Sequence, residues 1–175
     1  QNYLGSDQQK LPKGPTLNLS NVNAAFVGDN SYFGMTAPLQ GWRYRLGVEQ
    51  YFGDYQFTAL LADGRKYFYL KPLTFAVRGL AYARTGGTST AFSLQYPLFA
   101  GNSFFVRGYD RNVFSAQEDP DFIYRTVGSK MMVGNFEIRL PFTGPRRLSL
   151  IKSNFLVTDL NLFFDAGLAF YEKGV

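Results

Sequence analysis

Arg107, in the stretch FFVRGYD, is the side chain whose charge most needs an explanation. A glycine follows it, aromatic residues surround it, and the segment from about Phe99 to Arg125 has neither a strand nor a helix period. Segments of that length without secondary structure are usually functional or disordered. A guanidinium that leaves bulk water is costly unless carboxylates meet it with good hydrogen-bond geometry. The chemistry indicated here is therefore ion pairing.

Catalytic and metal chemistry have few residues available. The sequence holds no histidine and no cysteine, which excludes Ser-His hydrolysis, His-ligated zinc and thiolate metal sites. It contains no nucleophile-elbow, phosphate-loop or dinucleotide-binding motif. The carboxylates of AQEDPD, residues 116–121, lack the alternating spacing of a calcium loop, so we expect an exposed acidic loop there. We expect no enzymatic activity, no metal and no cofactor.

The composition is typical of a β-rich protein. The 175 residues include 18 Phe, 12 Tyr and 18 Gly, and the length allows one domain with a core. The net charge of +5 comes from scattered Lys and Arg, with one tight pair at Arg146 and Arg147. That pattern does not make a nucleic-acid-binding patch, so we expect no nucleic-acid partner. The start, QNYLGSDQQK, has neither an initiator methionine nor a signal peptide, so we expect a mature or internal fragment.

Apolar and polar residues alternate with a period of two in segment after segment. Since residues i and i+2 share a face only in a strand, these segments are expected to be two-faced strands. The alternating apolar sets are Trp42, Tyr44, Leu46 and Val48; Tyr55, Phe57, Ala59 and Leu61; Met132, Phe136, Ile138 and Leu140; and Leu160, Leu162, Phe164, Ala166, Leu168 and Phe170. The opposite faces include Arg43, Arg45 and Glu49, then Asn135, Glu137 and Arg139, then Asp159, Asn161 and Asp165.

Turn residues separate these segments at 28–30, 37–41, 62–64, 85–87 and 143–145. We predict about eight strands, at roughly 17–27, 31–37, 42–51, 55–62, 66–84, 88–97, 127–141 and 156–170. No apolar run reaches the roughly 18 residues that a membrane helix needs. Residues 1–16 are expected to be an irregular lead-in to a single domain that spans 1–175.

The alternation alone fits two architectures. In a soluble sandwich or barrel the apolar face points inward, whereas in a transmembrane barrel it points to lipid and the polar face lines the lumen. Strands of ten or more residues suit a tilted bilayer crossing. Tyr and Phe gather near strand ends, as in interfacial girdles, and the polar faces combine Arg, Glu, Asp and Gly. The pattern favours the membrane.

Three stretches between residues 99 and 167 resemble successive signatures of one family. GNSFFVRGYD, GNFEIRLPF and LNLFFDAG, in this order and spacing, are similar to motifs of the BamA-like bacterial surface-antigen superfamily, which includes the two-partner-secretion transporters. Upstream, YFGDYQFTALLADGRKYF and TFAVRGLAYARTGG also resemble barrel strands of that family. The resemblance covers about residues 40–170.

The resemblance implies an all-β fold, an antiparallel transmembrane β-barrel in a bacterial outer membrane. The family barrel is sixteen-stranded and follows periplasmic repeat domains, so this chain corresponds to a partial barrel with outer-membrane lipid as a partner. A partial barrel exposes a strand edge that lipid does not tolerate. We therefore expect the remaining strands to come from residues not shown or from another chain.

In the family, the loop that matches residues 99–126 is extracellular and folds back into the lumen, with its Arg-Gly tip on the inner wall. The resemblance then assigns the tip to Val106, Arg107, Gly108 and Tyr109, with Gly108 passing close to the wall and Tyr109 packing beside it. Parity independently places Glu137 and Asp165 on the lumen face, and the family pairs its loop arginine with acids at these positions. Two alternatives stay open: Arg107 is a solvated loop residue, or the two acids pair with Arg139 or Arg78.

The resemblance implies insertion, assembly or translocation of proteins at a bacterial outer membrane, with client proteins or secretion and assembly subunits as partners. A second possibility is a structural or accessory barrel that anchors an attached domain or joins a larger secretion complex. A third, a soluble ligand-binding β-barrel, would require a chain that is extractable without detergent. The sequence does not separate the first two, which differ in the domains that flank the barrel.

Overall fold

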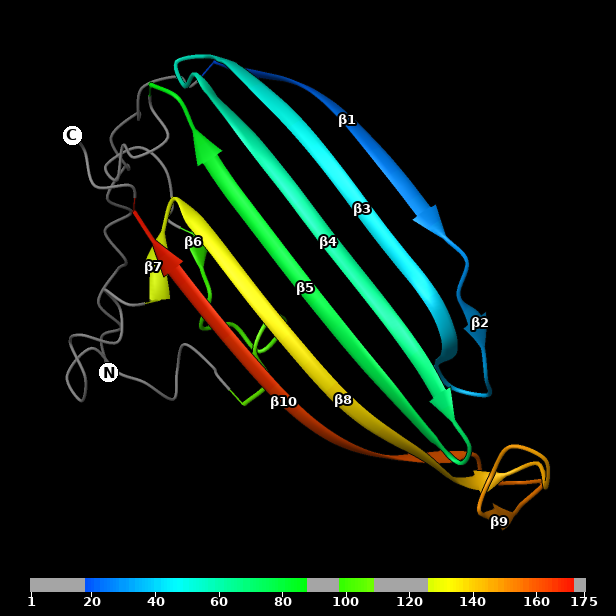
Figure 1. Cartoon of the computed structure of the whole chain (residues 1–175). Coiled ribbons are helices and arrows are strands. Elements are labelled where there is room, and N and C mark those ends of the chain that lie inside the picture. The colour runs from blue at the N-terminus through cyan, green and yellow to red at the C-terminus, as the bar shows by residue number, and fades with distance from the viewer. Residues whose placement is uncertain (1–17, 88–97, 109–125, 172–175) are drawn as a thin grey trace, which may run out of the picture.

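The computed structural model describes residues 18–87, 98–108 and 126–171. Most of these residues form one antiparallel sheet whose long strands run in the order β1-β3-β4-β5-β8-β10 (Figure 1). The long strands are β1 (Leu19–Asp29), β3 (Pro38–Gly53), β4 (Phe57–Leu70), β5 (Leu73–Thr85), β8 (Lys130–Gly144) and β10 (Thr158–Phe170). The expected all-β antiparallel fold is confirmed. In the described residues, no helix has the length and apolar character needed to span a membrane.

Four short strands complete the architecture. β2 (Tyr32–Phe33) pairs with β3, and β9 (Ile151–Lys152) runs parallel to the end of β8. β6 (Leu98–Phe99) and β7 (Val127–Gly128) form a separate two-stranded sheet. Among the described strands, β1 and β10 each have a long neighbour on one side only, so the barrel is not closed in this chain.

Two of the predicted boundaries are wrong at the same place. Ala62, Asp63 and Gly64 form no turn but lie inside β4, which continues to Leu70; the chain reverses at Lys71 and Pro72, so 66–84 is two strands. The ladder explains this, because β4 is paired along this stretch with β3 on one side and β5 on the other. The predicted strand at 31–37 shortens to β2, and the one at 88–97 lies outside the described residues.

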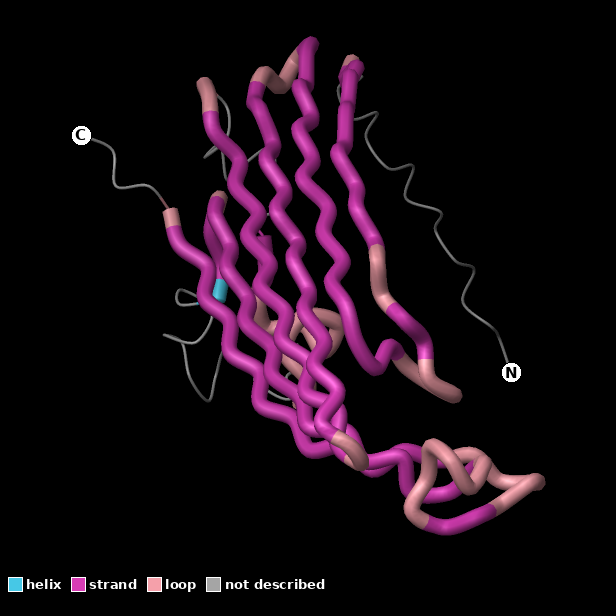
Figure 2. The backbone as a smooth tube through the Cα atoms, turned by 45° about the vertical axis from the view of Figure 1, so that its right-hand side comes forward, coloured by secondary structure: helices cyan, strands magenta, loops and turns pink. Residues whose placement is uncertain are grey.

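The register divides the side chains of the long strands between two faces. We call inner the face that carries Asn135, Glu137 and Asp165, and outer the opposite one; residues 98–108 lie against the inner face (Figure 2). The outer face is apolar and exposed. Its large side chains include Val22, Phe26, Leu46, Val48, Phe52, Leu60, Phe68, Val77, Met132, Phe136, Leu160, Leu162, Phe164 and Leu168. This is the face that a transmembrane barrel presents to lipid.

One apolar set does not follow this rule. Phe57, Ala59 and Leu61 lie on the inner face, where Phe57 stacks on Tyr51 with ring centroids 4.4 Å apart. Phe57 and Ala59 form a buried cluster with Tyr55 near the β3–β4 turn, whereas Leu61 is half-buried against the cluster around Val106. The alternation at 55–61 was therefore correct in period but opposite in direction, because aromatic packing inside the barrel end replaces polar lining there.

The sheet curls strongly at the end that holds the β2–β3 turn. The hydroxyl of Thr36, in that turn, donates to the carboxylate of Asp159 on β10, although three strands separate β3 from β10 in the sheet order. Met35 of the same turn lies against Gly144 at the end of β8. This contact holds opposite sides of the open sheet together, and it needs a strongly curved wall.

We expect the two faces of β10 to respond oppositely to a cation. Leu162 is 70% exposed on the outer face, and Leu162→Lys should lower the free energy of unfolding by about 2–4 kcal/mol, the cost of a charge facing the bilayer interior. Asn161→Lys, one residue away on the inner face, should change it by less than about 1 kcal/mol. Urea unfolding of the full-length protein in lipid vesicles measures both. Similar losses would contradict the assignment of the faces.

Candidate functional site

The segment 98–108 forms a compact turn that presents Val106 and Arg107 to the wall. The amide of Ala100 donates to the carbonyl of Thr126 at 2.8 Å, which continues the pairing of β6 with β7. Beyond it the backbone winds around Asn102, whose carbonyl accepts from the amides of Phe105 and Val106. The Asn102 side chain also accepts from the amide of Phe104. The local hydrogen bonds thus fix which side chains face the sheet.

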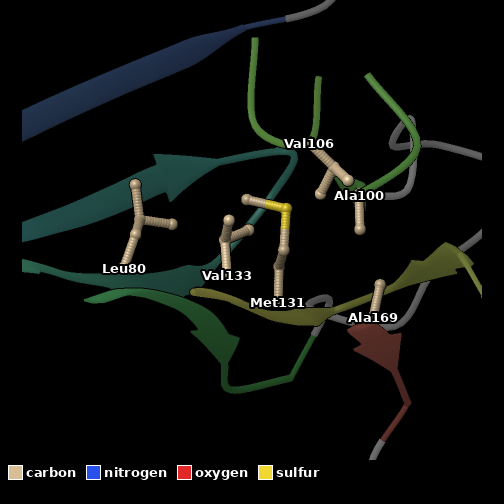
Figure 3. Packing of buried hydrophobic residues seen from close by; sticks show 6 residues of the cluster. All are labelled: Leu80, Ala100, Val106, Met131, Val133 and Ala169. Carbon is tan, nitrogen blue, oxygen red and sulfur yellow. The ribbon is translucent and has the colours of Figure 1, made fainter. Parts of the chain in front are cut away.

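Apolar packing seats this turn on the inner face. Val106 and Ala100 are buried against Met131 and Val133 of β8, Ala169 of β10 and Leu80 of β5 (Figure 3). Gly167 makes the approach possible, since a Cβ there would lie 2.8 Å from Cγ2 of Val106. The glycine in the stretch LNLFFDAG therefore marks the place where the turn meets the wall.

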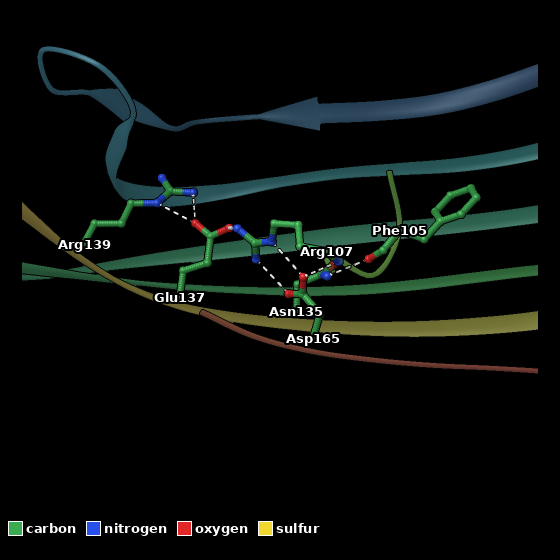
Figure 4. Close-up of polar contacts among 6 residues, drawn as sticks. All are labelled: Phe105, Arg107, Asn135, Glu137, Arg139 and Asp165. Carbon is green, nitrogen blue, oxygen red and sulfur yellow. Dashed lines mark hydrogen bonds and ion pairs between the residues drawn. The ribbon is translucent and has the colours of Figure 1, made fainter. Parts of the chain in front are cut away.

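Asp165 receives Arg107 through three hydrogen bonds. The guanidinium Nε and Nη2 donate to Oδ2 and Oδ1 of Asp165, both at 2.7 Å, and the amide of Arg107 donates to Oδ2 at 2.9 Å (Figure 4). The Asp165 side chain is 2% exposed and that of Arg107 is 35% exposed. A two-pronged contact between a guanidinium and a carboxylate is strong and fixes orientation as well as distance.

Glu137 and Phe163 complete the surroundings of the guanidinium. Nη1 of Arg107 donates to Oε1 of Glu137, while Oε2 of Glu137 accepts from Nε of Arg139 at 2.6 Å. The guanidinium carbon also lies 4.0 Å from the centre of the Phe163 ring, within cation–π range. The hydrogen bonds to Asp165, then those to Glu137, raise the pKa of Arg107 above its usual value, so the side chain stays charged.

We call Arg107, Arg139, Glu137 and Asp165 the arginine cluster. Two cations and two anions make it neutral, and its strand members come from β8 and β10 alone. Asn135 adds a neutral tie, because its side-chain amide donates to the carbonyl of Phe105 at 2.9 Å. The cluster thus attaches the turn to two neighbouring strands at one level of the wall.

The structure brings together four of the six residues singled out in the sequence. Val106 is buried, and Arg107 meets both Glu137 and Asp165. Of the alternatives left open, Arg139 does share Glu137, whereas Arg78 does not contact either acid and pairs with Asp63. Tyr109 and the acidic stretch 116–121 lie outside the described residues.

The expectation for Gly108 needs a correction. No described atom lies within 4 Å of the position its Cβ would take, so close approach to the wall is not the reason for a glycine there. The backbone itself is the reason, because φ is +86° and side-chain-bearing residues rarely adopt that conformation. The positive φ therefore favours a glycine directly after Arg107.

Several inner-face residues were missed by the sequence analysis. Phe163 was assigned no role, although its parity with Asp165 could have placed it beneath the guanidinium. Asp63 accepts from both Arg65 and Arg78, with Nη2–Oδ2 distances of 3.0 and 2.9 Å, and so forms a second ion group on the inner face. The interpretation of 62–64 as a turn hid this residue. Its i, i+2 relation to Arg65 was the available signal.

We expect Gly167→Ala to push the turn away from the wall. The new Cβ would clash with Val106, and the free energy of unfolding should fall by about 1–3 kcal/mol, the usual cost of overpacking. Val106→Ala in the same protein removes the clashing methyl group and should recover part of the loss. Gly134→Ala is the matched control, since nothing lies within 4 Å of its Cβ position. Equal effects at 167 and 134, measured by chemical unfolding, would contradict this account.

Asp165→Asn tests the ion pair without changing the shape of the side chain. It leaves a +1 cluster, and we expect a loss of about 2 kcal/mol in stability, less than for a fully buried pair because Arg107 is a third exposed. Asp29→Asn is the control: Asp29 also pairs with an arginine, Arg43, but both side chains are exposed, so the loss in stability should be much smaller. The comparison uses denaturant unfolding of the full-length protein, and equal losses would rule out a special role for Asp165.

Comparison with known proteins agrees with the fold and with the resemblance of the motifs. A search of curated proteins found no match. A family model described as the Omp85 superfamily domain matches residues 7–174, nearly the whole chain. Proteins of this superfamily form β-barrels in the bacterial outer membrane and act in transport and assembly rather than as enzymes. The chain belongs to the Omp85 superfamily.

Proposed function

We propose that this chain is part of an outer-membrane barrel that inserts, assembles or translocates client proteins, and that the arginine cluster fixes an inner loop on which that activity depends. The observation that carries the proposal is the contact of Arg107 with Asp165 and Glu137. It joins a segment from the β5–β8 connection to two strands on their inner face. Membership of the Omp85 superfamily supports a general role in protein insertion or secretion at the outer membrane.

The proposed mechanism is mechanical and involves no covalent step. A loop that is attached to β8 and β10 stiffens this side of the wall, because bending the two strands apart would separate Arg107 from one of its acids. Among the described residues, no other connection between strands is attached to two neighbouring strands by ion pairs. Deformation is then expected at the strand edges, where client strands or lipid would be accommodated.

The unpaired edges of the sheet support the same proposal. β1 and β10 are the two edge strands of the sheet, and the free edge of each has no long partner strand in the described structure. In hydrocarbon each unsatisfied backbone group costs several kcal/mol. We infer that further strands, from the rest of a longer chain or from another chain, complete the barrel in the outer membrane, with client proteins or secretion subunits as its partners.

Arg107→Ala in the full-length protein is expected to slow client assembly several-fold, because two acids and Arg139 are left with an excess negative charge and the loop loses its attachment. Arg107→Lys should be intermediate, since an ammonium keeps the charge but not the two-pronged contact. Insertion of a urea-denatured β-barrel client into vesicles that hold the protein, followed by protease protection, measures the rate.

Arg45→Ala is the control for this experiment, because Arg45 lies on the inner face outside the arginine cluster. Heat-modifiable gel mobility shows whether each variant is folded. Normal mobility and normal client assembly with Arg107→Ala would refute the role of the cluster. A wild-type protein that folds in vesicles but assembles no client would instead favour an accessory barrel that anchors another domain.

A further inference from the structure

The connection between β8 and β10 is a structured tip that projects beyond the sheet. Residues 145–157, PRRLSLIKSNFLV, form it, and it lies at the end opposite to the loop that carries Arg107 (Figure 1). The amides of Leu148 and Ser149 donate to the carbonyl of Pro145, and the amide of Ser153 donates to the carbonyl of Gly144. β9 pairs with β8 within it. The backbone is therefore held in one shape.

This tip exposes an unusual amount of apolar surface. Phe155 is 98% exposed and Leu150 is 61% exposed, and the other exposed apolar side chains of the tip are Ile151, Leu156 and Val157. They are not isolated, because the chain leads from Val157 directly into β10, where Leu160 and Leu162 lie exposed on the outer face. The apolar surface of the tip thus continues the surface that faces lipid.

The tip also carries charge of one sign. Arg146, Arg147 and Lys152 are exposed, and residues 145–157 contain no Asp or Glu. In the part of the chain that the structure describes, none of these three cations forms an ion pair. Four arginines of the inner face differ in this respect, because Arg65, Arg78, Arg107 and Arg139 all contact carboxylates.

We propose that the tip formed by residues 145–157 binds anionic phospholipid at the membrane surface, with Arg146, Arg147 and Lys152 on the headgroup phosphates and Phe155, Leu156 and Val157 at the acyl boundary. Apolar side chains beside unpaired Lys and Arg are the combination that lies in the interface of a bilayer. The occupant is assigned to lipid rather than to a protein because the apolar surface is continuous with the outer face of β10.

Each Lys or Arg near an anionic bilayer surface strengthens binding to that surface by about fivefold. The proposal concerns the lipid around the barrel, and it stands whether or not the barrel assembles clients.

A tryptophan at the tip, Phe155→Trp, tests the proposal in the full-length protein. The protein is placed in phosphatidylcholine vesicles with a minor share of phosphatidylglycerol. Two preparations are compared, one with brominated phosphatidylcholine and one with brominated phosphatidylglycerol. Fluorescence is taken as the difference from the parent protein, so that Trp42 does not contribute. We expect quenching by both lipids, but several-fold stronger by phosphatidylglycerol per mole of lipid. Raising the salt to about 0.5 M should remove most of this preference.

Charge variants in the same background separate the cations from the apolar residues. Arg146→Gln with Arg147→Gln and Lys152→Gln should bring the preference to about one while quenching by phosphatidylcholine persists. Arg146→Lys with Arg147→Lys should keep the preference, and so should Arg45→Gln, which removes a cation from the inner face. Heat-modifiable mobility confirms that each variant is folded.

Two results would overturn the proposal. No quenching by either lipid would place the tip in water, as expected for a surface that docks a soluble protein. Equal quenching by the two lipids at low salt would show apolar insertion without recognition of the anionic headgroup. The salt dependence is measured without any charge variant. The proposal can therefore be refuted even if the variant with Gln at positions 146, 147 and 152 does not fold.

Discussion

A guanidinium held against the wall of a barrel is stable only where carboxylates replace its water, and that requirement constrains the strands around Arg107. Asp165 and Glu137 lie on neighbouring strands, and both face inward because β8 and β10 pair in one register. A slip of one residue in either strand would turn its acid toward lipid. The ion pairs of Arg107 thus depend on the register of two strands. The same ion pairs in turn stabilise that register.

Apolar packing and ion pairing contribute differently to the attachment of the loop. The contacts of Val106 and Ala100 with Met131, Val133 and Ala169 remove apolar surface from water, but they would tolerate small shifts of the turn. The hydrogen bonds to Asp165 fix the position, since a two-pronged contact loses strength when either partner rotates. Gly167 serves both, because it lies two residues after Asp165 and lets the turn come close.

The sequence was sufficient for the fold class and for the faces of most strands, because period two is a local property. The acids Glu137 and Asp165 could be placed by parity, whereas contact with Arg107 rested on resemblance, since no local pattern says where a long loop folds. Errors arose where tertiary pairing overrides local preference. Asp63 and Gly64 resemble a turn but are held in β4 by strands on both sides, and Phe57 packs inside the barrel rather than toward lipid.

Ion pairing differs between the inner face of the sheet and the tip formed by residues 145–157. On the inner face, every arginine of the two ion groups has an acid within hydrogen-bond distance, which offsets the cost of removing its charge from bulk water. At the β8–β10 tip the cations have no such partner among the residues that the structure describes, although Asp159 is close in sequence; its carboxylate instead accepts from Thr36. The exposed cations of the tip lie in the same segment as the exposed Phe155, and a bilayer containing anionic lipid offers both a counter-charge and an apolar phase to such a surface.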